Sequence, residues 1–324
     1  MGEFRKVVLS RKGFDSKAGG SYSPFDPQTG KYVVLPIPID DIERDICNSQ
    51  KYEDIRIQSN YLPSYSETNL KSLMAAMGKK AKIKGKESEY AHFDPWLGPC
   101  PWLAEDNHPI GTFGQVDRAQ THLANQGVGK GSLFLFFSRF TPIQNTENRI
   151  VPNISHEHLD KGLYFIYGWL RVKEVIKKYE DISDLRLLSK HPHATKNYFK
   201  KYVNNTLYIA DKFLFNDRSN IPGCGYFSRL NKDLCLTASD SVQEPRRWIP
   251  SRWSLPSFFF EKRPSLLQHR KWVVREDGSC LVETSGQWQE AVFDKSEEFC
   301  RWFDRLLEQV VGNVYRKSPL HGMS

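Results

Sequence analysis

Two short histidine-rich segments carry residue types used for metal binding and acid–base chemistry. They are HEH at 156–158 and HPH at 191–193. Zinc sites usually add cysteines, or place two histidines four residues apart on one helix, as in HExxH. Neither segment has this spacing, and the six cysteines form no CxxC pair. We therefore expect no metal and no cofactor, and we expect the cysteines to be reduced thiols packed inside the fold.

A glycine-rich turn, GVGKG at 127–131, leads into the apolar run LFLFF at 133–137. A phosphate-binding P-loop needs Ser or Thr directly after its lysine, but Lys130 is followed by Gly131. A dinucleotide-binding turn follows a strand and opens a helix, whereas this turn precedes an apolar run. The pattern is typical of a tight turn before a strand that is buried on both faces.

Three segments mix cations with aromatic rings, namely 191–202, 246–263 and 269–272. Cations pair with phosphates, and flat rings stack on unpaired bases. Taken singly, each segment favours rings that belong to the core, with the cations on a solvent-facing side. The chain as a whole has 46 Lys and Arg against 38 Asp and Glu, a net charge of +8. Three such segments in a basic chain favour nucleic acid as the partner.

Length and hydropathy limit the class of protein further. The mean hydropathy is −0.56, no apolar run is long enough to span a bilayer, and the first residues lack the apolar core of a signal peptide. We expect a cytoplasmic protein with no membrane association. No repeat or linker divides the 324 residues, which predicts a single compact domain over 1–324. The oligomeric state stays open.

Periodicity predicts more strand than helix. Strands are expected at 6–9, 32–35, 133–137, 164–176 and 207–210, with a hairpin at 272–282 around Asp277-Gly278. A short helix is expected at 69–77, and a longer one with an apolar stripe at 295–311, capped by Asp294 with Glu297. The expected class is α+β, with a mixed or antiparallel sheet and peripheral helices.

Nine segments, taken in order, resemble one known family. They are LSRKGFDS at 9–16, LPIP at 35–38, HFDP at 92–95, FGQ at 113–115, AQTHL at 119–123, QGVG at 126–129, LFLFF at 133–137, IYGWLRV at 166–172 and HPH at 191–193. The chain resembles the third family of nucleotide-modification-associated domains of bacteria and phages. The turn and the two strands around 127–172 are also similar to the core of PUA-like barrels, which accept flipped bases. This likeness implies a PUA-like β-barrel core over roughly 105–215.

The resemblance implies a hydrolase that acts on DNA in antiviral defence. Relatives include DNA glycosylases that flip out and excise a hypermodified cytosine, for example a glucosylated hydroxymethylcytosine, from phage DNA and leave abasic sites. Two other functions stay open, which are a non-catalytic reader of modified bases and an enzyme that builds the modification. A lysine-dependent lyase, with Lys12 as the amine, is also open.

If the resemblance holds, base excision passes through a transition state like an oxocarbenium ion, which calls for a carboxylate and a positioned water. Asp15 and then Asp94 are the candidate catalytic carboxylates, and either could instead cap a turn. The candidate residues for binding DNA or the flipped base are Arg11, Lys12, Phe14, Gln115, Gln120, His122, Asn125, Gln126, Trp169 and His193. Their amides, imidazoles and cations suit base edges, sugar hydroxyls and phosphates, and the rings suit stacking.

Overall fold

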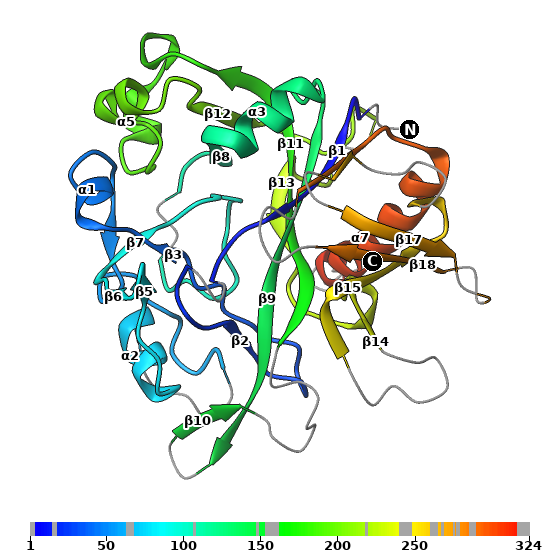
Figure 1. Cartoon of the computed structure of the whole chain (residues 1–324), viewed down its shortest axis with the longest axis horizontal. Helices are drawn as coiled ribbons and strands as arrows, with labels where there is room; N and C mark the ends of the chain where they lie inside the picture. Colours follow the sequence, from blue (N-terminus) through cyan, green and yellow to red (C-terminus); the bar gives the residue numbers. More distant parts are fainter. Residues whose placement is uncertain are drawn as a thin grey trace, which may run out of the picture.

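Two long antiparallel strands, β9 (Leu133–Thr146) and β11 (Leu163–Ile176), run through the middle of the molecule (Figure 1). A glycine turn precedes β9, as the sequence predicts, and Gly131 has a positive φ of 80° that favours glycine. The computed structural model describes residues 4–14, 18–62, 68–105, 108–146, 149–152, 162–217, 220–239, 248–259, 265–266, 269–274, 276, 279–284 and 290–315.

The main sheet is mixed, as predicted. Its path is β16 (Ser265–Leu266), β19 (Ala291–Phe293), β1 (Val7–Arg11), β9, β11, β12 (Thr206–Ala210) and β8 (Thr112–Gln115), with β2 (Ser23–Phe25) and β10 (Arg149–Pro152) beside β9 and β13 (Cys224–Tyr226) beside β11. β1 and β2 are parallel to β9, and the other pairs are antiparallel.

The main sheet curls without closing. Phe113 in β8 contacts Phe134 in β9 with ring centroids 5.0 Å apart, although β12 and β11 separate the two strands. In a flat sheet these strands would be about 14 Å apart, so the contact requires strong curvature. Among the described strands β8 and β16 do not pair, so no closed barrel is found there. The PUA-like barrel core stays a prediction.

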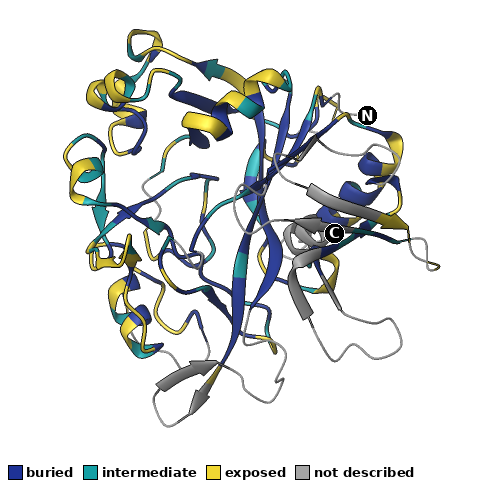
Figure 2. Ribbon diagram, in the orientation of Figure 1, coloured by how far each residue is buried: buried dark blue, intermediate teal, exposed yellow. Residues whose placement is uncertain are grey.

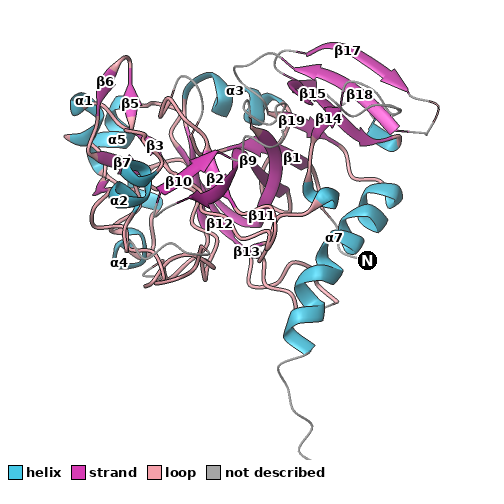
Figure 3. Ribbon diagram, turned by 90° about the horizontal axis from the view of Figure 1, so that it is seen from below, coloured by secondary structure: helices cyan, strands magenta, loops and turns pink. Residues whose placement is uncertain are grey.

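Smaller elements flank the main sheet. The further strands are β14 (Thr237–Ser239), β15 (Trp248–Pro256), β18 (Ser279–Thr284) and β17 (His269–Val274) in one sheet, β3 (Ile37–Pro38), β7 (Tyr90–His92) and β4 (Gln50–Lys51) in another, and the pair β5 (Lys82–Ile83) and β6 (Lys86–Glu87). The helices are α1 (Asp41–Arg44), α2 (Leu70–Ala76), α3 (Asp117–Asn125), α4 (Leu185–Leu188), α5 (Lys196–Lys201) and α7 (Glu297–Tyr315), with 3-10 turns at Tyr179–Asp181 and Lys232–Leu234. The four-stranded sheet and α7 lie on one side of β9 and β11, and α1, α2 and α5 lie on the other (Figures 1 and 3).

The core follows the two long strands (Figure 2). Residues 133–137 are fully buried because both faces of β9 are covered. On one face Phe136 packs against Phe113, and on the other Phe137 packs against Trp253 of β15. One continuous apolar cluster extends from Phe4 to Leu307. The single-domain prediction is compatible with this cluster and stays a prediction. No helix within the described part of the chain has the length and apolar character needed to cross a bilayer.

Several elements differ from the sequence-based expectations. Residues 32–35 are buried but make only one isolated bridge, from Tyr32, so the predicted strand there is wrong. α3 forms over a stretch where no helix was expected. The C-terminal helix is confirmed, but the predicted cap is wrong, since the Ser296 hydroxyl accepts the Phe299 N–H while Asp294 pairs with Lys6. β17 and β18 form the predicted hairpin, whose Asp277-Gly278 turn lies outside the described residues.

Truncating the core of β9 should destabilise the protein strongly. Phe136→Ala removes a fully buried ring that contacts Phe113 and Phe134, and a cost of about 3–5 kcal/mol is expected. Urea unfolding followed by tryptophan fluorescence measures it. Val203→Ala, at a residue that is 93% exposed, is the control and should change the unfolding free energy by less than about 0.5 kcal/mol. Equal effects of the two substitutions would contradict this core.

Candidate functional site

A buried carboxylate, Asp94, lies at the centre of the candidate site in the loop between β7 and β8. Its Oδ1 accepts a hydrogen bond from the backbone N–H of Gly114 at 3.0 Å and lies 3.1 Å from Nε2 of His191. The Asp94 side chain is 2% exposed. A carboxylate removed from water needs such partners, because desolvation of an unpaired charge costs several kcal/mol. Both partners are distant in sequence, so Asp94 is not a local turn cap.

The neighbours of Asp94 keep it ionised. Burial alone would raise the pKa of its carboxyl group. The hydrogen bond and charge of His191 are the largest effects that oppose burial, and the neighbours together lower this pKa to about 2. Asp94 is therefore an acceptor and a negative charge throughout the neutral pH range.

Asn205 fixes the orientation of His193 beside this carboxylate. The Asn205 side-chain N–H donates to the backbone carbonyl of His193 at 2.9 Å, which turns Oδ1 of Asn205 toward Nδ1 of His193 at 2.7 Å. We infer from this network that Nδ1 carries the proton. Nε2 of His193 is then the nitrogen that faces Oδ2 of Asp94, at 3.9 Å. Burial lowers the pKa of His193 well below its ordinary value, which favours the neutral ring.

His92, Asp94 and His193 could together hold a metal ion. Their candidate ligand atoms all lie within 4.8 Å of one another. Two imidazoles and one carboxylate form a ligand set suited to zinc or ferrous iron. The sequence prediction of no metal considered only 191–193 and 156–158. His92 and Asp94 come from a loop about a hundred residues earlier, which spacing within one segment does not reveal.

A lysine, Lys12, lies close enough to Asp94 for their charges to interact. Lys12 follows β1, and its backbone N–H donates to the carbonyl of Phe137 at 2.9 Å. Its Nζ lies 4.5 Å from the centre of the Phe113 ring. Burial lowers the pKa of Lys12, and the charges of Glu290 and Asp94 oppose this effect without cancelling it.

A second buried carboxylate, Glu290, completes the group. Its Oε1 accepts hydrogen bonds from the Gln115 side-chain amide at 2.6 Å and from the Ser10 hydroxyl at 3.2 Å. Its Oε2 is buried and has no hydrogen-bond partner among the described residues. An unpaired buried oxygen is costly, so such atoms are typical of sites that bind something. Lys12 is partly buried, and we call the group formed by it with His92, Asp94, His191, His193 and Glu290 the buried polar centre.

A small cavity touches this centre. Asp94, Gly13, Tyr167 and Tyr226 are among its lining residues, and its volume is about 20 Å³. That is room for a single water molecule. The hydroxyl of Tyr167 is buried and has no hydrogen-bond partner among the described residues. A water beside an ionised carboxylate and a phenol would have the polar partners it needs.

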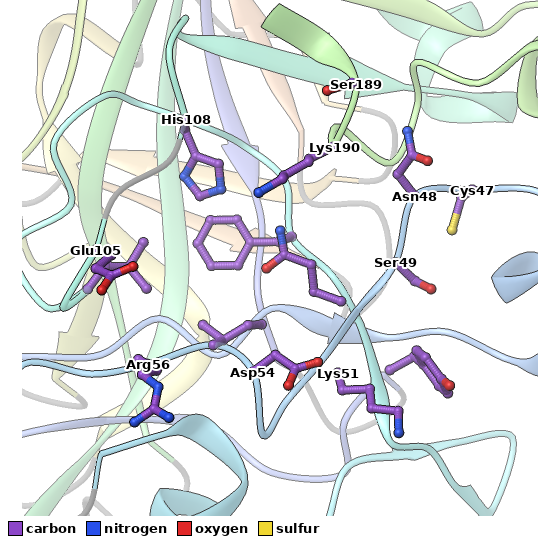
Figure 4. A pocket seen from close by; sticks show the side chains of 15 residues that line it. Cys47, Asn48, Ser49, Lys51, Asp54, Arg56, Glu105, His108, Ser189 and Lys190 are labelled. Atoms are coloured by element: carbon purple, nitrogen blue, oxygen red, sulfur yellow. The ribbon is translucent and has the colours of Figure 1, made fainter. Parts of the chain in front are cut away.

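A much larger pocket, of about 710 Å³, lies next to the cavity (Figure 4). Phe93 lines both, and the Asn48 side-chain N–H donates to the backbone carbonyl of His191 at 3.1 Å. Figure 4 shows Lys190 and His108 on one side of the pocket and Asp54 and Lys51 on the other. The lining is Cys47, Asn48, Ser49, Gln50, Lys51, Asp54, Ile55, Arg56, Tyr90, Phe93, Leu103, Glu105, His108, Ser189 and Lys190. This volume and polarity suit a small polar ligand.

The structure brings four of the predicted site residues together around β8. Lys12, Asp94 and His193 belong to the buried polar centre, and Gln115 holds Glu290. Gln120 is buried nearby and accepts a hydrogen bond from the Tyr208 hydroxyl at 2.9 Å, so its oxygen is occupied.

The other predicted residues lie elsewhere or in the core. Phe14 is fully buried and packs edge-on against Tyr52. Trp169 is buried, with its indole N–H donated to the carbonyl of Pro222, and its ring is a core element in this structure. Arg11 is partly buried, 5.6 Å from the centre of the Tyr164 ring. His122, Asn125 and Gln126 line the end of α3, where Asn125 is exposed and Nε2 of His122 is buried without a described partner. Asp15 lies outside the described residues.

Sequence reasoning missed several members of this arrangement. Glu290 precedes a short apolar strand and has no motif around it. Tyr167 was expected only as part of the strand over 164–176. His191 was considered only as a metal ligand of the HPH segment, and His92 stood in the quoted segment HFDP with no role given to it.

Together these features define an α+β protein in which a buried group of acids, imidazoles and one amine adjoins a polar pocket. A match to a family model confirms the resemblance that the motifs indicated. Residues 6–294 match the family described as nucleotide modification associated domain 3, and the chain belongs to this family. Its description associates the chain with nucleotide modification. No curated protein and no solved structure gives a significant match.

Gly114 should be intolerant of a side chain. A Cβ at this position would lie 2.2 Å from Cγ of His193, while the ring itself is held by Asn205. Gly114→Ala is expected to lower the unfolding free energy by about 1–3 kcal/mol through overpacking. Gly129→Ala is the matched control, because a Cβ there meets nothing within 4 Å. Urea unfolding of both variants tests this, and a Gly114→Ala protein as stable as the Gly129→Ala protein would contradict the close packing.

The Asp94 carboxylate should make stability depend on acid pH. Its folded pKa of about 2 lies below the ordinary value of 3.8, so its stabilising contribution is full above about pH 5 and is lost as pH falls toward 2. At neutral pH this contribution is roughly 2 kcal/mol. Urea unfolding of wild type and Asp94→Asn across this range should show a stability difference that shrinks with acid. A difference in unfolding free energy that does not change with pH would contradict the lowered pKa of Asp94.

Proposed function

We propose that this protein is a DNA glycosylase that excises a hypermodified cytosine, such as a glucosylated hydroxymethylcytosine, from phage DNA. The product is an abasic site, and the role is antiviral defence. Family membership supports a link to modified nucleotides. The net charge of +8 suits a DNA partner. The single observation that carries the proposal is the buried Asp94 carboxylate, ionised and oriented by Gly114 and His191.

Breaking an N-glycosidic bond builds positive charge on C1′ and the ring oxygen of the sugar. A fixed negative charge in a dry site stabilises such a transition state far more than it would in water. Asp94 meets both requirements, because it is ionised at neutral pH and 2% exposed. Its Oδ1 is occupied by Gly114 and His191, so Oδ2 is the oxygen we assign to the sugar.

The small cavity has room for the water molecule that attacks C1′ of the sugar and takes the place of the base. This water would lie between Asp94 and the hydroxyl of Tyr167, both of which border that space. The water oxygen bonds to C1′ as the bond from C1′ to the base nitrogen breaks. The base departs with the bonding electron pair and one proton, and the second proton of the water stays on the new sugar hydroxyl.

The flipped base needs a place of its own, since its target bond is inaccessible inside a duplex. The large pocket supports this step, because it adjoins the cavity through Phe93 and carries the amides of Asn48 and Gln50. Those amides can read base edges or sugar hydroxyls. Lys51 and Lys190 on its wall suit the flanking phosphates. More specifically, we propose that the large pocket is a PUA-like base pocket.

Asp94→Asn should abolish excision while DNA binding persists. Purified protein is incubated with modified and with unmodified DNA, and released bases are quantified by mass spectrometry. A loss of about 100- to 1000-fold in rate is expected for a removed charge-stabilising group. Asp181→Asn, at an exposed residue, is the matched control and should keep wild-type activity.

Three outcomes would contradict the proposal. Binding of modified DNA without base release would identify a reader. Activity that requires an added donor molecule would identify an enzyme that builds the modification. Full activity of the Asp94→Asn variant would show that Asp94 takes no part in the chemistry.

A further inference from the structure

Lys12 is the amine of the buried polar centre, and the proposed excision gives it no chemical step. Its backbone is fixed by the hydrogen bond to Phe137, and its Nζ lies over the Phe113 ring. No described carboxylate lies within 4.0 Å of this Nζ. The surface lysine Lys71 differs, because it pairs with Glu53 at 2.7 Å.

This difference sets the reactivity of the amine. Ion pairing with Glu53 raises the pKa of Lys71, whereas burial lowers that of Lys12. Only the neutral amine has the lone pair that attacks carbon. A lysine in a desolvated place, with no direct ion pair, is the kind that enzymes use for imine formation.

Strand β8 brings this amine to the two buried acids. Three consecutive residues of β8 each contact a different group. The ring of Phe113 supports Nζ of Lys12, the N–H of Gly114 holds Asp94, and the amide of Gln115 holds Glu290. The amine and both carboxylates therefore converge on one short strand. The charges of Glu290 and Asp94 both act on Lys12.

We propose that Lys12 forms an imine with C1′ of the abasic sugar and so gives the protein a strand-cleaving lyase activity. The inference rests on the proposed base excision, whose product is this sugar. Nζ adds to the C1′ aldehyde of the ring-opened sugar, and the aldehyde oxygen leaves as water with one proton from the amine and one from solvent, so that a protonated imine remains. A carboxylate, Glu290 or Asp94, takes a proton from C2′. The electron pair moves through the enamine and expels the 3′ phosphate, and water then hydrolyses the imine and restores the lysine.

Borohydride trapping tests this step without any base excision. The probe is a duplex oligonucleotide that already contains one abasic site, incubated with the full-length protein and sodium borohydride. Reduction converts the imine into a stable secondary amine that joins protein and DNA. Wild type should give the adduct, Lys12→Arg should lose it, and Lys71→Arg should keep it. Peptide mass spectrometry of the wild-type adduct should locate the DNA on Lys12, which needs no variant to fold.

An adduct on another lysine, or no adduct with wild type, would overturn the inference. Base release without strand cleavage would leave the proposed excision intact and reject the lyase step alone. A trapped adduct on Lys12 in a protein that releases no base would support the amine and reject the excision. The two proposals can therefore fail separately.

Discussion

The hydrogen bond from the Gly114 backbone to the buried carboxylate of Asp94 is the interaction on which this structure depends most. An ionised group without water must find its partners inside the protein, and the partners here come from distant parts of the chain. Gly114 can serve because it has no side chain, which lets the His193 ring lie directly against the strand. The same three-residue segment supports Lys12 and Glu290. One strand thus contacts the amine and holds both carboxylates of the centre, Glu290 through Gln115.

The fold explains why β8 can do this. The sheet curls, so that Phe113 packs against β9 although two strands lie between them in the sheet. This curl places the first residues after β1, which runs beside β9, close to β8 at the far end of the sheet. The apolar rings of β9 keep water away from the group, which strengthens each electrostatic interaction within it. The neighbouring polar pocket then supplies the open volume that the centre lacks.

Local patterns predicted much of the fold and part of the site. The apolar run of β9, the strand β11 and the stripe of α7 were readable because burial on a face leaves a period in the sequence. Four residues could be predicted as site residues because they stood in recognisable motifs, namely Asp94, Lys12, Gln115 and His193. Residues 32–35 look like a strand, yet they are buried without ladder partners, because burial alone gives the same apolar run. Glu290 and Tyr167 carry no local signal, since only tertiary packing brings them to Asp94 and Lys12.

The central claim is that a carboxylate shut away from water is nevertheless ionised, and it can be observed directly. A carbon-detected NMR titration of the Asp94 side chain, assigned through the Asp94→Asn variant, reports its charge in the folded protein. The account predicts that this carboxyl is still ionised at about pH 4, where an exposed aspartate is about half protonated. An Asp94 that takes up its proton above that pH would contradict the account, because its negative charge would then not be held by His191 and Gly114.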